Sequence, residues 1–112
     1  MVIEYIRYTT EASRAEALLE AYRTASAILR ESPHCLAFEL SRCSEDERSY
    51  ILRIVWDSVE GHLSGFRKSP QFAEFFAAIA PYVGDIKEMR HYDVTDVAWV
   101  RGSGAKRDEV TT

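Results

Sequence analysis

Strand-like and helix-like segments alternate along this chain in an order that few folds accommodate. Residues 2 to 9, VIEYIRYT, are rich in β-branched and aromatic side chains and predict a strand. Residues 34 to 43 and 49 to 56 alternate apolar and polar side chains, which predicts two more strands. Only five polar residues, SEDER, join them, so we expect a hairpin. Residues 86 to 94 predict a fourth strand.

The segments between these strands have helical periodicity. From Ala15 to Leu29 apolar residues recur every three or four positions, and Ser13 with Glu16 has the spacing of a capping box. After the third strand, Asp57 with Glu60 predicts the cap of a short helix. That helix carries glycines at 61 and 65, one turn apart, which would let another group approach its backbone. Ser and Pro at 69 and 70 predict a second helix start.

The order of elements is therefore βαββαβ, which predicts an α+β, ferredoxin-like fold with a four-stranded sheet and helices on one face. In the hairpin we expect Glu39 opposite Arg53 and Leu36 opposite Trp56. The uncovered face would then carry a mixture too apolar to be left bare. It comprises Ile3, Tyr5, Arg7, Ala37, Glu39, Ile51, Arg53, Met89 and His91.

This mixture predicts a homodimer in which two sheets pack face to face, as in a dimeric α/β barrel. Trp99 lacks an obvious place in the monomer core, so we expect it to extend the last strand onto the partner. We expect one domain over residues 1 to 100 and a disordered tail over residues 101 to 112, where the sequence is polar and contains glycine.

Composition narrows the classes of partner. A net charge of -4 provides no basic surface for a phosphate backbone, so nucleic acid is not expected. No apolar run is long enough to span a membrane, and the start of the chain does not resemble a targeting peptide. We therefore expect a cytoplasmic protein. Cys35 and Cys43 lie too far apart on one strand to form a disulfide, so we expect free thiols.

Metal and cofactor motifs are not found in the sequence. Histidines 34, 62 and 91 fall on separate elements, and no HxxxH or HExxH spacing occurs. The single GxG lies in the tail, and no GxSxG motif for a nucleophilic serine is present. We therefore expect no metal and no cofactor, so that any reaction would use chemistry supplied by the substrate.

Three stretches carry a resemblance to a known family. SPHCLAFEL, ILRIVWDS and SPQFAEFFAAI resemble the strand, the W-x-S strand end and the S-P-x-F helix start of the antibiotic biosynthesis monooxygenases. The resemblance covers about residues 2 to 94 and implies a ferredoxin-like, dimeric α/β barrel. Family members include cofactor-free quinone-forming oxygenases and haem-degrading oxygenases.

The chain also departs from the family pattern. The family histidine lies three residues before the Ser-Pro pair, where this chain has Phe66, and His62 lies one helical turn earlier. The chain contains no asparagine, although both the haem-degrading and the aromatic-polyketide branches use one beside the pocket. Of the family's pocket positions, only Trp56 is matched here.

Candidate site residues follow from the elements and the resemblance. Trp56 could stack on a planar ligand and donate its indole N–H to it, or could be a plain core residue. His62 could be a general base, or an exposed or capping histidine. Tyr8 and Tyr92, expected on the helix-facing side with Phe38 and Trp56, could orient substrate hydroxyls. The expected substrate-binding residues are Trp56, Phe38, Phe66, Phe72 and Tyr22.

Taken together, these features favour a cofactor-independent monooxygenase that acts on a small phenol- or quinol-type aromatic held between sheet and helices. One alternative is a non-catalytic module that binds a hydrophobic ligand or docks on a haem protein. A haem-binding or haem-degrading oxygenase is a third. His91 with Glu39 and Arg53 could be catalytic, but an interface hydrogen-bond network is favoured.

Overall fold

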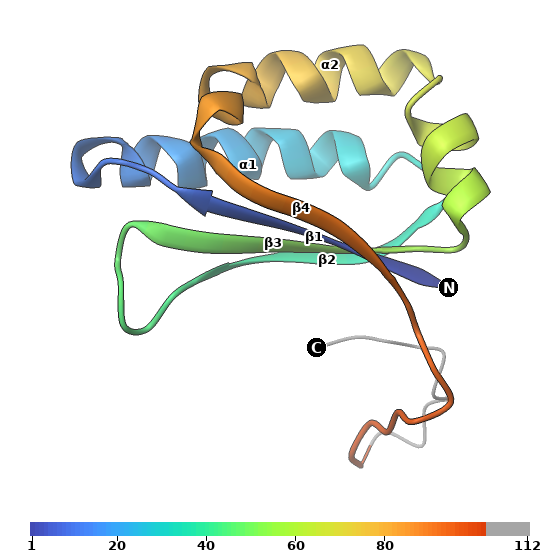
Figure 1. Ribbon diagram of the computed structural model, residues 1–112. Helices are drawn as coiled ribbons and strands as arrows, with labels where there is room; N and C mark the ends of the chain where they lie inside the picture. Colours follow the sequence, from blue (N-terminus) through green and yellow to red (C-terminus); the bar gives the residue numbers. More distant parts are fainter. Residues whose placement is uncertain (103–112) are drawn as a thin grey trace.

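Four antiparallel strands form one sheet in the order β2-β3-β1-β4. The computed structural model describes residues 1 to 102 and contains β1 (Val2–Thr9), β2 (Cys35–Arg42), β3 (Ser49–Trp56) and β4 (Ile86–Asp93). Two long helices, α1 (Ala15–Leu29) and α2 (Pro70–Ile79), lie side by side over one face of the sheet (Figure 1). The predicted α+β, ferredoxin-like arrangement is confirmed.

Short helical turns complete the helical layer. They are η1 (Ala12–Arg14), the π-helical turn η2 (Gly61–Phe66) and η3 (Ala80–Asp85). The capping box predicted at Ser13 and Glu16 is wrong: Arg14 is the residue before α1 and no side chain caps the helix. Since η1 already places Ser13 in helical backbone, it cannot take the extended conformation of an N-cap.

The helical segment after β3 begins at Val59, one residue later than predicted, and continues into η2. Ser58, not Asp57, caps it, because the Gly61 N–H donates to Ser58 Oγ at 2.8 Å. Asp57 instead accepts a bond at 2.9 Å from His34 Nδ1. The His34 ring lies so close to Gly61 and Gly65 that an added Cβ would approach it within 2.8 Å and 2.4 Å. The two glycines therefore admit His34, as their spacing suggested.

A bulge at the start of β2 changes which side chain meets Trp56. Glu39 lies opposite Arg53, as predicted, but Cys35 and not Leu36 lies opposite Trp56. The register shifts between Cys35 and Ala37, so Leu36 is the extra residue. Cys35 packs against the core while Leu36 is 53% exposed.

A second bulge reverses the faces of β4. Ile86 pairs with Tyr8 and Glu88 with Arg7, which leaves Lys87 as the extra residue. The register then aligns His91 with Glu4 and Met89 with Ile6, both on the helix-covered face. The predicted positions of Met89 and His91 on the uncovered face are therefore wrong. So is the predicted position of Tyr92 beside Trp56, since Tyr92 pairs with Ile3 on the uncovered face.

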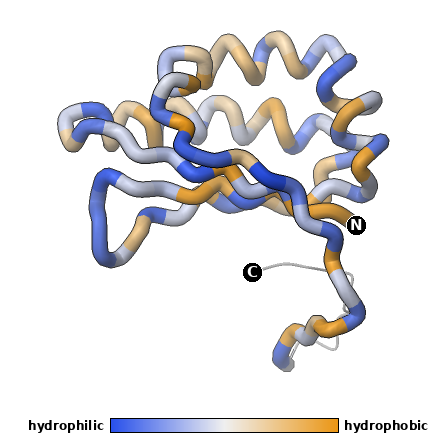
Figure 2. Tube along the Cα trace, viewed as in Figure 1, coloured by the Kyte–Doolittle hydropathy of each residue, from blue (hydrophilic) through white to orange (hydrophobic). Residues whose placement is uncertain are grey.

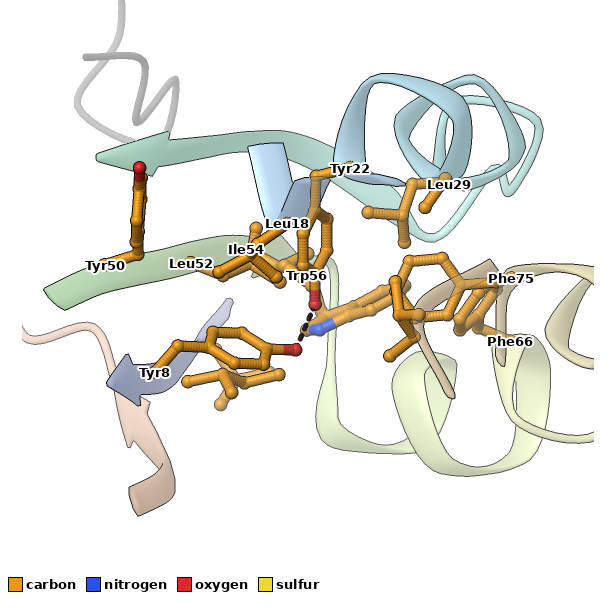
Figure 3. Close-up of a cluster of buried hydrophobic side chains, with 14 residues drawn as sticks. Tyr8, Leu18, Tyr22, Leu29, Tyr50, Leu52, Ile54, Trp56, Phe66 and Phe75 are labelled. Carbon is orange, nitrogen blue, oxygen red and sulfur yellow. Dashed lines mark hydrogen bonds between the residues drawn. The ribbon is translucent and has the colours of Figure 1, made fainter. Parts of the chain in front are cut away.

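The hydrophobic core lies between the sheet and the two long helices. Figure 3 shows ten of its buried members: Tyr8, Leu18, Tyr22, Leu29, Tyr50, Leu52, Ile54, Trp56, Phe66 and Phe75. The loop that joins β2 and β3 is hydrophilic and projects away from this core (Figure 2). Of the side chains on α1 that its periodicity predicts for the core, Leu18, Tyr22, Ala25 and Leu29 are buried, whereas Ala15 and Leu19 are only half-buried.

The uncovered face carries mixed side chains in a regular arrangement. Arg53 Nη1 donates to both carboxylate oxygens of Glu39 at 3.1 and 3.2 Å, and the Tyr5 and Tyr92 rings meet edge to face with centroids 5.5 Å apart. After Asp93 the chain leaves the sheet and runs below its uncovered face (Figure 1). Trp99 is exposed there, and whether it contacts a partner stays a prediction.

Most of the predicted tail, from residue 103 to 112, lies outside the described residues. The described part ends at Gly102, and its last element is β4. Within that part no helix has the length and apolar character needed to cross a membrane.

Candidate functional site

A cavity of about 170 Å³ lies between the sheet and the α2 layer. Most of its walls are apolar, and three exposed apolar side chains, Phe76, Val83 and Met89, are among the residues that line it. The other lining residues are Glu4, Ile6, Tyr8, Ile54, Trp56, His62, Phe66, Arg67, Phe72, Phe75, Ile79 and Ile86. These residues come from β1, β3, β4 and the helical segments between 61 and 85.

Trp56 occupies the inner end of this cavity. It is the last residue of β3 and is fully buried. Its indole N–H donates to Glu4 Oε1 at 3.0 Å, so that group is not available to a ligand as the sequence had suggested. The indole instead fixes the position of a carboxylate on the neighbouring strand.

Glu4 is the functional candidate that sequence reasoning missed. It is only 4% exposed, because alternate residues of β1 face the helices and the first, third, fifth and seventh positions of the strand are all buried. Burial raises the pKa of the Glu4 carboxyl above its usual range, although the Trp56 bond and the nearby His91 act in the opposite direction. The sequence did contain a signal for Glu4: it is a charged residue on a strand face whose other members are apolar or aromatic.

His62 lies beside this carboxylate. The η2 turn places it 4% exposed, with its ring stacked on Trp56 at a centroid distance of 4.6 Å. Neither ring nitrogen has a hydrogen-bond partner among residues 1 to 102. Burial, with the nearby His91 and Arg67, lowers the pKa of His62 to about 4, so its imidazole is neutral at pH 7. A buried polar group without a partner is unusual in folded proteins.

Glu4, His62 and His91 form a cluster at the polar end of the cavity. His62 Nε2 lies 3.6 Å from Glu4 Oε1, and His91 Nε2 lies 3.8 Å from Glu4 Oε2. The two imidazole rings have centroids 5.0 Å apart. His91, on β4, is the most exposed of the three. The cluster could not be read from sequence spacing, because its members come from β1, η2 and β4.

A wall of rings forms the apolar part of the cavity. Phe66 lies against Trp56 with centroids 5.2 Å apart, and it also contacts Phe72 and Phe75 edge to face. Tyr8 contributes the only hydroxyl among the lining residues, and that hydroxyl bonds to the Tyr22 hydroxyl on α1 (Figure 3). Phe66 and His62 both pack against the Trp56 indole.

The predicted site residues are only partly brought together. Trp56, His62, Tyr8, Phe66 and Phe72 line the cavity. Tyr22 does not line the cavity; it contacts two residues that do, Tyr8 through their hydroxyl bond and Phe75 through an edge-to-face ring contact. Phe38 packs against the core but does not line the cavity. Tyr92 lies on the opposite face of the sheet, because of the bulge in β4.

Comparison with known proteins agrees with this architecture. The family model for antibiotic biosynthesis monooxygenase matches residues 1 to 78. The chain belongs to this family. An uncharacterized protein of Bacillus subtilis, YczJ, is 27% identical over 73 residues, which are 65% of this chain and 77% of that protein.

Solved structures of the antibiotic biosynthesis monooxygenase family share the fold. One from Bordetella bronchiseptica, provisionally assigned to the family, has a TM-score of 0.70 at 20% identity and covers 84% of this chain and 96% of its own. Another with the same provisional assignment, from Deinococcus radiodurans, has a TM-score of 0.70 at 16% identity and covers 91% of this chain and 100% of its own. At these identities the likeness describes the fold and not the reaction.

Proposed function

We propose that this member of the family is a monooxygenase that oxidises a small phenol- or quinol-type aromatic inside the cavity. The observation that carries the proposal is the meeting of a ring-lined cavity with a desolvated Glu4–His62 pair at one end. Rings favour a flat aromatic ligand. A neutral histidine beside a buried carboxylate can accept the proton of a phenol.

The size of the cavity limits the substrate to a single ring or a little more. A cavity of about 150 Å³ holds a benzene-sized ligand, and the volume here is about 170 Å³. Typical pockets for drug-sized ligands measure roughly 300 to 1,000 Å³. Haem and three-ring polyketides therefore do not fit the cavity in its present form, which disfavours the haem-binding alternative.

The proposed reaction balances without an added reductant. A phenol with hydrogen on its para carbon reacts with one O₂ to give one para-quinone and one water, and the substrate supplies all four electrons. The Glu4–His62 pair takes the phenolic proton, and the apolar walls keep bulk water from the phenolate. Tyr8 lies on the same wall, where its hydroxyl can orient a substrate oxygen.

The test is oxygen uptake by protein treated with a chelator, using single-ring phenols and hydroquinones. A hydroquinone with hydrogen on a ring carbon would react with one O₂ to give one hydroxyquinone and one water, so it too would gain one oxygen atom. We expect quinone formation with one ¹⁸O atom from labelled O₂ and no hydrogen peroxide. Replacing His62 by phenylalanine, which keeps a ring on Trp56, should lower kcat by about a hundredfold or more if it is the proton acceptor. Uptake at the buffer rate with every substrate would end the proposal.

A matched pair of tyrosine variants tests the position of the site. Tyr8→Phe should raise KM or lower kcat, whereas Tyr92→Phe, on the opposite face of the sheet, should change neither. Equal effects would contradict a site on the helix-covered face.

A non-catalytic ligand-binding module is the second candidate. It is favoured by the single hydroxyl that the cavity presents and by the Trp56 N–H, which is already bonded to Glu4. Binding of single-ring aromatics without oxygen uptake, measured by quenching of tryptophan fluorescence, would select this candidate.

A further inference from the structure

We propose that Glu4, His62 and His91 form a binding site for one divalent first-row transition-metal ion. The inference goes beyond the proposed reaction and does not depend on it. The two are alternative states of the same groups, because a bound ion would use the Glu4 carboxylate and the His62 lone pair that the proposed reaction needs as proton acceptor. It also reverses the expectation from the sequence, which excluded a metal because the histidines lie on separate elements. The bulge in β4 brings His91 to the same face as Glu4.

The ligand set has the composition of a known class of metal sites. Two imidazoles and one carboxylate bind zinc, iron and cobalt and leave further coordination positions open. One ligand atom from each of the three residues lies within 4.8 Å of the others. Ligands on one ion, at about 2.0 to 2.2 Å from it, lie roughly 3 to 3.5 Å apart. The present distances are 3.6 Å from His62 to Glu4 Oε1 and 3.8 Å from His91 to Glu4 Oε2, and the three ligand atoms lie within 4.8 Å of one another, so the side chains must close in by up to about 1 to 2 Å to share one ion.

His91 can supply most of that movement. Its side chain is 35% exposed, and β4 is an edge strand, so solvent leaves the imidazole room to turn. The same exposure provides an entry path for a hydrated ion. The other two ligands are held in place, because Trp56 stacks on His62 and donates to Glu4.

The unpartnered histidine is the independent observation that points to a ligand. His62 is nine-tenths or more buried, and its Nε2 is directed at Glu4 without a hydrogen bond, at 3.6 Å. A metal ion between them would use the imidazole lone pair and neutralise a desolvated carboxylate, so it would remove two unfavourable features at once. Trp56 would then act as the outer partner that orients the carboxylate ligand.

The surrounding charges allow a cation at this place. Arg67 also lines the cavity, but it is exposed and its guanidinium lies over the Phe72 ring at 5.4 Å. Its charge acts on both His62 and Glu4 and opposes a cation there, so the Glu4 carboxylate is the group that must attract the ion. The open coordination positions of the ion would face the ring-lined cavity, where an oxygen or nitrogen atom of a small ligand could occupy one.

The experiment is titration of chelator-treated, tag-free full-length protein with Co²⁺ and with Zn²⁺, without any substrate. We expect one ion per chain by calorimetry and d–d absorption bands for Co²⁺. His91→Ala, on the exposed strand, and Glu4→Gln, which keeps an oxygen for the Trp56 bond, should each weaken binding by about a hundredfold or more. Trp56→Phe, which removes only the outer partner, should weaken it by about tenfold to a hundredfold.

His34→Ala is the matched control. His34 pairs with Asp57 and is not part of the cluster, so the His34→Ala variant should bind the metal ion as tightly as the wild-type protein. Absence of binding by the wild-type protein would overturn the inference. So would binding that His91→Ala and Glu4→Gln leave unchanged, or binding that His34→Ala abolishes. If Glu4→Gln fails to fold, His91→Ala decides the question alone. Because no oxygen is measured, failure here leaves the proposed reaction testable on its own.

Discussion

The two faces of the sheet place a glutamate in very different surroundings. On the uncovered face, Glu39 receives two bonds from Arg53, and its charge is matched in a direct ion pair. On the helix-covered face, Glu4 receives one bond from Trp56, and two histidines stand at 3.6 and 3.8 Å without bonding to it. The first arrangement is complete in one chain. In the second, buried polar atoms have no hydrogen-bond partner. Such a site can bind a proton, an ion or a ligand oxygen.

The faces differ in packing as well. Two helices cover one face, whereas Ile51 is exposed on the other face. Every residue of β4 except the first is exposed in the single chain. We therefore retain the proposal that a second copy covers the face that carries Tyr5, Ile51 and Arg53.

Ile51→Glu should have the largest effect, because it places a charge among the exposed side chains of that face, on one of the two inner strands. We expect the wild-type protein to have about twice the chain mass of 12.8 kDa by light scattering, and the variant to have the mass of one chain. Leu63→Glu makes the same change at an exposed position on η2 and should leave the mass unchanged. A wild-type protein that is monomeric at all concentrations would contradict the proposal.

Trp56→Ala probes the covered face and should have the next largest effect. Removing a fully buried tryptophan costs about 3 to 5 kcal/mol of unfolding free energy and also takes the donor from Glu4. Leu36→Ala serves as the control, since the β2 bulge turns Leu36 outward and the change should cost less than about 0.5 kcal/mol. Denaturation with urea measures both. A large cost at Leu36 would show that the predicted register, without the bulge, is correct.

The strands and the long helices could be predicted from the sequence because their signals are local. Alternation in β1 and β3 and periodicity in α1 are set by which side chains must be buried, and the bounds of β1 and β3 were predicted to the residue. Helix caps were predicted less well. At Ser13 a local 3₁₀ turn replaced the capping box, and at Asp57 the partnership with His34 removed the candidate cap.

The site could be predicted only in part, because two bulges decide it. One extra residue in β4 exchanged the faces of His91 and Tyr92, and one in β2 exchanged Cys35 and Leu36. Nothing in the residue types near Lys87 distinguishes a bulged strand from a regular one. The aromatic wall was predictable from composition and periodicity, whereas the Glu4–His62–His91 cluster depends on tertiary register.

The pH dependence of stability should report on the cluster that contains Glu4 and His62 on the helix-covered face. His62 has a pKa of about 4 when folded and about 6.5 when unfolded, so below pH 6.5 the unfolded chain binds the extra proton. Stability from this group is therefore complete above pH 6.5 and is lost as the pH falls towards 4, by about 3 kcal/mol. Glu4, whose pKa is raised, acts in the opposite direction as the pH rises above 4.5.

His62→Phe isolates the histidine contribution, because it keeps the stacking on Trp56 and removes the titrating group. Urea denaturation between pH 4 and pH 7 should then show a flatter dependence on pH than in the wild-type protein. Equal slopes for His62→Phe and the wild type would mean that His62 is solvated and not part of a dry cluster.

Tyr22→Phe should have the smallest effect. It tests whether the covered face also contains polar groups whose hydrogen bonds are fully satisfied within the chain. Burial raises the pKa of both Tyr8 and Tyr22, so their bond joins two neutral hydroxyls. Losing one such bond costs about 1 kcal/mol. Tyr82→Phe is the matched control, since the Tyr82 ring lies under Arg14 at 5.0 Å and its hydroxyl has no bond within the described chain. If urea denaturation shows no difference between the two variants, the bond to Tyr22 does not stabilise the fold. The Tyr8 hydroxyl would then be, like the Glu4 cluster, a polar group that is free to bond to a ligand.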